Sequence, residues 1–107
     1  MYRILITGPA KQDIQSAHDW WAENHSRKIA AQWYSGMRKS IESLSLMPER
    51  CPLAPESDLL KTGIRQLHYG LSHRPTHRVI FTIDGSEIVV LAVRHTSQDA
   101  LSSDDLV

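Results

Sequence analysis

The stretch from Thr76 to His95 reads Thr-His-Arg-Val-Ile-Phe-Thr-Ile-Asp-Gly-Ser-Glu-Ile-Val-Val-Leu-Ala-Val-Arg-His. Two runs rich in β-branched and aromatic residues flank Asp84-Gly85, a dipeptide typical of a two-residue type I′ hairpin turn. With these two residues as the turn, Ile83 faces Ser86. Both faces of the resulting hairpin are apolar in the middle. The stretch is therefore predicted to form a hairpin at the centre of a sheet and not at its edge.

This register also fixes which side chains share a face, because neighbouring strand residues point to opposite sides. One face carries Arg94 together with His77, Val79, Phe81, Ile83, Ile88, Val90 and Ala92. The other carries Arg78 together with Thr76, Ile80, Thr82, Glu87, Val89, Leu91, Val93 and His95. Arg78 and Arg94 are thus expected on opposite faces, where they line one site only if a bulge or a twist intervenes.

Periodicity outside the hairpin predicts two helices and two further strands. Tyr2–Thr7 alternates as a strand and ends at Gly8-Pro9, and residues 10–23 then repeat apolar side chains at helical spacing. Ser26 is expected to cap a second helix whose apolar stripe is Ala30, Trp33, Met37, Ile41 and Leu44. After an irregular, proline-containing connection, Gly63–Tyr69 reads as a strand. Residues 96–107 are expected to be a loose acidic tail or a short helix.

The order β-α-α-β-β-β predicts an α+β fold, with a helical hairpin packed on one face of a mainly antiparallel four-stranded sheet. Residues 1–107 are expected to form one domain. Alternation places a second group of side chains on the opposite face, which no helix is expected to cover. That group is Arg3, Leu5, Arg65, Leu67, Tyr69, Arg78, Ile80, Leu91, Val93 and His95. An exposed apolar face with arginines is typical of a partner-binding groove.

Composition narrows the class of protein. The 107 residues contain 12 basic and 12 acidic side chains, a balance that argues against non-specific coating of nucleic acid. The basic residues nevertheless concentrate between positions 60 and 95. Cys51 is the single cysteine, which excludes an intramolecular disulfide and fits a reducing compartment. The longest apolar run, Ile88–Val93, is too short to span a membrane, and the cytoplasm is the expected location.

The sequence offers little for metal or cofactor chemistry. Pro75 lies between His73 and His77 and excludes the helical geometry that would make their spacing useful to a metal ion. No cofactor motif is present, and Cys51 lacks a base at recognisable spacing. The strand arginines can either pair with acidic residues of the helices or, with nearby histidines, hold a phosphodiester as metal-free ribonucleases do. Both readings stay open.

Three segments carry a resemblance to a known family. Ile64–Leu67, His77–Gly85 and Val89–His95, taken with the element order and the length, resemble the RelE/ParE superfamily of bacterial toxins. These are the toxin halves of type II toxin–antitoxin operons. The resemblance implies a chain held inactive by a cognate antitoxin. In one branch such toxins cleave messenger RNA on the ribosome, and in the other they inhibit DNA gyrase.

The matched residues favour the ParE-like branch. Arg78 matches the strand arginine of both branches, and Arg94-His95 resembles the strand-end pattern of ParE-like members. No tyrosine follows His95 and no lysine lies in Gly63–Tyr69, and these departures from the nuclease pattern count against RNA cleavage, although His95 equally matches the terminal histidine of some nucleases. The expected binding residues for the antitoxin or the target are Arg65, Leu67, Tyr69, Arg78, Ile80, Leu91, Arg94 and His95. The alternative is a ribosome-dependent mRNA endoribonuclease that uses Arg65, Arg78 and His95.

Overall fold

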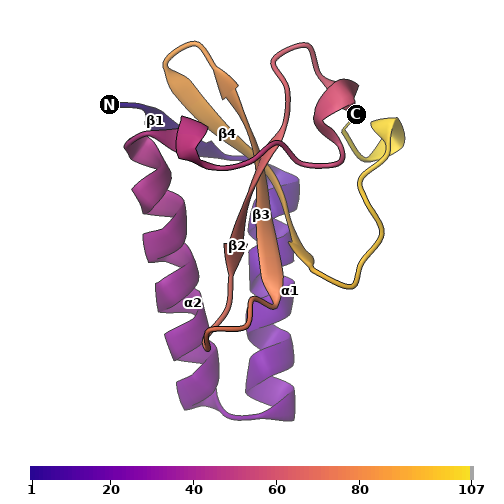
Figure 1. The fold of residues 1–107 in the computed structure, drawn as a ribbon. Coiled ribbons are helices and arrows are strands. Elements are labelled where there is room, and N and C mark those ends of the chain that lie inside the picture. Colours follow the sequence, from indigo (N-terminus) through magenta and orange to yellow (C-terminus); the bar gives the residue numbers. More distant parts are fainter. Residues whose placement is uncertain (107) are drawn as a thin grey trace.

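The computed structural model describes residues 1–106, which form two antiparallel helices against one four-stranded sheet (Figure 1). The strands are β1 (Arg3–Ile6), β2 (Arg65–Tyr69), β3 (His77–Asp84) and β4 (Glu87–His95), in the spatial order β1-β4-β3-β2. The two pairings among β2, β3 and β4 are antiparallel, whereas β1 lies parallel to β4. The predicted α+β fold and element order are confirmed, with a sheet that is mixed because of β1.

The helices begin where the sequence supplies capping side chains. In α1 (Gly8–Asn24), the Thr7 hydroxyl accepts a hydrogen bond from the Ala10 amide at 3.3 Å. In α2 (Arg27–Glu42), the Ser26 hydroxyl accepts one from the Ile29 amide at 3.1 Å, as predicted. These bonds satisfy amides that the helix itself leaves unpaired. Within residues 1–106, neither helix is long and apolar enough to cross a membrane.

The central hairpin forms, but its turn is displaced by one residue from the predicted position. Asp84 pairs with Glu87, so the two loop residues are Gly85 and Ser86, and Ile83 faces Ile88 instead of Ser86. Gly85 has a φ of 61° and Ser86 does not adopt a positive φ. A glycine at the first loop position is typical of a type II′ turn, whereas type I′ needs positive φ at both positions.

A β-bulge in β4 changes the faces of the sheet. Phe81 pairs with Val90, but Ile80 pairs with Ala92, which leaves Leu91 as an extra residue. Every β4 residue after Leu91 therefore points to the side opposite to the one that simple alternation predicts. Arg94 lies beside Arg78 on the face away from the helices, and the predicted separation of the two arginines is wrong.

The two faces of the sheet bury two apolar clusters. The larger cluster lies under the helices and contains Trp33, Met37, Val79, Phe81 and Val93 among its buried members. Tyr69 packs against it and donates a hydrogen bond to the Trp33 carbonyl at 3.0 Å. A Cβ on Gly36 would overlap with the Tyr69 hydroxyl, so this close approach of β2 to α2 depends on glycine.

The smaller cluster lies on the far face and is built by segments outside the regular elements. Its buried members are Ala54, Ile64, Ile80, Ala92 and Leu101, and Leu60, Leu91 and Leu106 pack against them. The face that the sequence predicts to be bare is thus partly covered by the connection before β2 and by the C-terminal segment. In Figure 1 these two segments lie together at one end of the sheet.

Candidate binding surfaces

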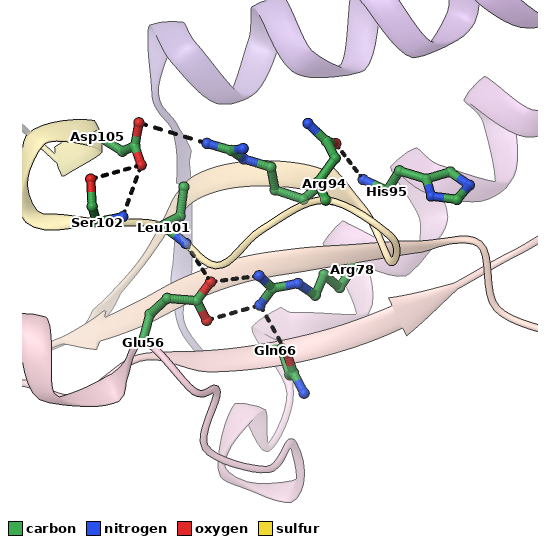
Figure 2. Close-up of polar contacts among 9 residues, drawn as sticks. Glu56, Gln66, Arg78, Arg94, His95, Leu101, Ser102 and Asp105 are labelled. Atoms are coloured by element: carbon green, nitrogen blue, oxygen red, sulfur yellow. Dashed lines mark hydrogen bonds and ion pairs between the residues drawn. The ribbon is translucent and has the colours of Figure 1, made fainter.

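A buried ion pair occupies the centre of the far face. Arg78 is 7% exposed and Glu56 is 3% exposed. Two guanidinium nitrogens of Arg78 donate to the two carboxylate oxygens of Glu56, at 2.9 and 2.5 Å, and one of them also donates to the Gln66 amide oxygen at 3.1 Å (Figure 2). The hydrogen bonds from Arg78 lower the pKa of Glu56 to about 2, although burial opposes that shift. This bidentate geometry satisfies both charges within the chain.

The ion pair also fastens the C-terminal segment to the sheet. The Leu101 amide donates to Glu56 Oε2 at 2.9 Å, and the Leu101 side chain is 6% exposed. Farther along, Asp105 lies 3.8 Å from Arg94 and accepts a hydrogen bond from the Ser102 amide at 2.8 Å (Figure 2). A short 3₁₀ helix spans Ser103–Leu106. Of the two alternatives predicted for the C-terminal segment, a loose tail or a short helix, the short helix is present at its end, and the segment packs on the far face.

The predicted binding residues do not share one surface. Leu67 and Tyr69 pack beneath the helices because they lie opposite Val79 and His77. Arg65 is on the same side and donates to the Cys51 carbonyl at 2.7 Å. The far face holds Arg78, Ile80, Leu91 and Arg94, and His95 lies on the helix side beyond the bulge. The prediction that one face gathers Arg65, Leu67, Tyr69, Val93 and His95 with Arg78 is wrong.

A second surface feature lies on the helix side, where α1 meets the ends of β3 and β4. It is an open, mostly apolar cavity of about 530 Å³, which we call the α1–β4 groove. It is lined by Asp13, Ser16, Ala17, Trp20, Trp21, Thr76, His77, Val93, His95 and Gln98. Sequence analysis found His95 but not Asp13. The helical spacing of Asp13, Ala17 and Trp21 was the available signal, since it places an acid in line with the apolar stripe.

Two histidines meet in this groove. The His77 and His95 rings lie 5.3 Å apart between centroids, edge to face. Burial, with a smaller effect of His95, lowers the pKa of His77 to about 4. The Ser97 amide donates to His95 Nδ1 at 3.1 Å, so that nitrogen is an acceptor and the proton of the neutral ring is on Nε2. Among the described residues lining the groove there is no lysine or arginine to hold a phosphodiester.

The three residues of the nuclease alternative therefore do not converge on one site. Arg78 is paired with Glu56, Arg65 is bonded to backbone carbonyls, and His95 points to the other side of the sheet from Arg78. Residues 1–106 also contain no group of three or more His, Cys, Asp or Glu side chains placed to hold a metal ion.

Comparison with known proteins finds a solved structure with the same fold and a family model that matches the sequence. A chain of the chromosomal ParDE toxin–antitoxin system from P. aeruginosa has the same fold, with a TM-score of 0.70 over 89% of this chain and 96% of that one, at 17% identity. No curated protein matches the sequence significantly. The family model for the ParE toxin of the type II toxin–antitoxin system parDE matches residues 4–100. The chain therefore belongs to the ParE toxin family of type II toxin–antitoxin systems.

Proposed function

We propose that this chain is a growth-inhibiting toxin that acts by binding DNA gyrase, and that a cognate antitoxin encoded beside it neutralises it in a toxin–antitoxin complex. Family membership supports the toxin role, and the ParDE relative is itself a toxin–antitoxin system. The observation that carries inhibition by binding, and not RNA cleavage, is the ion pair of Arg78 with Glu56. An arginine held in this way is not available to a phosphodiester.

The remaining candidate residues divide by accessibility. Arg94 keeps 23% of its side chain exposed and His95 is exposed, so a partner reaches them directly. Arg78 and Ile80 are buried, and a partner would contact them only after the C-terminal segment moved. We therefore assign target or antitoxin contact first to Arg94 and His95. Leu5 is 52% exposed on the far face of β1 and is a further apolar side chain that a partner can reach.

Two assays with purified protein separate the proposed activity from the alternative. We expect inhibition of gyrase-catalysed supercoiling and no cleavage of messenger RNA on translating ribosomes. Arg94→Ala should weaken the inhibition, whereas Arg74→Ala, which removes an exposed loop arginine of equal charge, should not. Ribosome-dependent cleavage that is lost in both Arg78→Ala and His95→Ala would contradict the proposal and identify an endoribonuclease.

Neutralisation is tested in cells. Expression of this chain alone should stop growth and induce the DNA-damage response, as gyrase inhibition does. Co-expression of the adjoining small reading frame should restore growth, and the two proteins should purify together. Growth arrest without DNA damage but with rapid loss of translation would instead favour an RNA target.

A further inference from the structure

The α1–β4 groove has the composition of a side-chain binding site. Residues 13, 16, 17, 20 and 21 of α1 form a single stripe along it, because positions three and four apart lie on the same side of a helix. Trp20 is 52% exposed and stands edge to face with Trp21 at 5.2 Å between ring centroids. His25 packs against Trp21 at 4.8 Å. The indoles are thus held in place before any ligand arrives.

One polar group of the groove, the carboxylate of Asp13, has capacity left for a ligand. The carboxylate of Asp13 accepts a hydrogen bond from the Val93 amide at 3.0 Å through Oδ2, and among residues 1–106 that is the bond we find for its side chain. The Nε1 atom of Trp21 is buried and has no hydrogen-bond partner among the described residues. Because that atom is buried, a ligand in the groove does not reach it, and the Asp13 carboxylate is the polar group open to a ligand.

The electrostatics of the groove select the charge of the ligand. Asp13 is the one carboxylate among its described lining residues, and none of them is a lysine or an arginine. Burial lowers the pKa of His77 and so disfavours the charged form of that ring. Burial raises the pKa of Asp13, while the Val93 amide and the charge of Arg94 oppose that shift. Arg94 itself points away to Asp105 on the far face, so the groove is a partly desolvated anionic site.

We propose that the α1–β4 groove binds an arginine side chain of the antitoxin, with the guanidinium at Asp13 and the side-chain stem against Trp20 and Trp21. Arginine fits better than lysine because its planar group stacks on indole rings and donates several hydrogen bonds at fixed angles. This inference rests on the proposed function for the source of the arginine. The preference for a guanidinium group follows from the residues of the groove alone.

A peptide titration tests the chemistry without the antitoxin. The probe is Ac-Leu-Arg-Leu-NH₂, and its control replaces arginine by citrulline, which keeps the shape and removes the charge. We expect the arginine peptide to shift the NMR signals of the Trp20 and Trp21 indole N–H groups at concentrations at least tenfold below those the citrulline peptide needs. Asp13→Asn should abolish that difference. Glu23→Gln, an exposed acid of the same helix, should leave it unchanged. Equal affinity for both peptides overturns the proposal.

Measuring the affinity of the antitoxin tests whether the bound arginine side chain belongs to that protein. The dissociation constant should rise at least tenfold in Asp13→Asn and in Trp20→Ala, while Glu23→Gln binds as the wild type does. If the antitoxin binds the Asp13→Asn protein with unchanged affinity, the inference is wrong and the proposed function stands. If no antitoxin binds any variant, the proposed function fails and this assignment of the arginine fails with it. If Asp13→Asn instead reduces self-association in sedimentation, the occupant is a second copy of the chain and the proposal is overturned.

Discussion

Arg78 and Glu56 are the residues whose substitution should cost the most stability. Removing one member of a buried ion pair leaves the other charge without a partner, which typically costs about 3–5 kcal/mol. We expect Glu56→Gln and Arg78→Met each to lower the free energy of unfolding by about 3 kcal/mol in urea denaturation. The double variant Glu56→Leu with Arg78→Met should lose less than either single variant, because it buries no unpaired charge. A double variant as unstable as the sum of the two would contradict this account.

The stability that the Arg78–Glu56 pair contributes should decrease in acid. The pKa of Glu56 is about 2 in the folded protein against an ordinary value of 4.5, so the unfolded chain takes up the proton first as the pH falls. The contribution of the pair to stability is therefore complete above pH 4.5 and is lost as the pH drops towards 2. In Glu56→Gln the stability should vary less with pH over this range. The exposed Glu23→Gln serves as the control.

Protonation of His77 should cause a separate loss of stability at a higher pH than the loss caused by Glu56. Its pKa is about 4 when folded and its ordinary value is 6.5, because burial disfavours the charged ring. Protonation thus favours the unfolded state, and stability should be full above pH 6.5 and fall between pH 6.5 and 4. His77→Phe should remove this slope in thermal melts while keeping an aromatic ring beside Trp33. His73→Gln, in an exposed loop, should retain the slope.

The bulge at Leu91 decides which side chains of β4 face the helices. Deleting Leu91 would remove the extra residue and leave the pairs Phe81–Val90 and Ile80–Ala92 in place, so Val93 would stay on the helix side and Arg94 on the far face. We therefore expect the deletion variant to fold, seen as a cooperative thermal transition by circular dichroism. Leu91→Ala keeps the chain length and should cost only about 1 kcal/mol, since Leu91 is partly exposed. A deletion variant that shows no cooperative transition would contradict the assignment of Leu91 as the extra residue.

Periodicity was sufficient to predict the elements but not the faces they present. The apolar stripes of residues 10–23 and 30–44, the cap at Ser26 and the end of the first strand at Gly8-Pro9 correspond to helices and their starts in the structure. Alternation fails in β4 because the bulge adds one residue that no local pattern marks. In β2 the residues do alternate, but the two sets were assigned to the wrong sides of the sheet. The connection Gly70–Thr76 is too long to fix the register, which the opposite residues on β3 set instead.

The surroundings of the candidate site residues were predicted less well than the fold, for a related reason. Arg78 and Arg94 were correctly singled out as residues that need an explanation on a strand, but their partners come from irregular segments. Glu56 precedes a single 3₁₀ turn and Asp105 lies in the C-terminal 3₁₀ helix. Contacts between such segments depend on tertiary packing, and sequence spacing carries no information about them.

For the molecule as a whole, the C-terminal segment should contribute to stability as a part of the far core. Leu101 is 6% exposed and packs with Ile80 and Ala92. Leu101→Ala should therefore lower the free energy of unfolding by about 2 kcal/mol, and should speed amide hydrogen exchange in β3 and β4. Ser103→Ala, exposed in the same segment, is the matched control. Unchanged stability in Leu101→Ala would mean that the segment is not part of the folded unit.

The parallel pairing of β1 with β4 has a consequence for how the chain folds while it is being synthesised. Ile4 and Ile6 need Ile88 and Val90 beside them, so the first strand to be synthesised waits for the last one. During translation, the growing chain exposes an unpaired strand until β4 has emerged from the ribosome, and pairings so distant in sequence form slowly. A nascent chain of this topology cannot complete its sheet until β4 has been made, so its two ends must meet before the fold is closed.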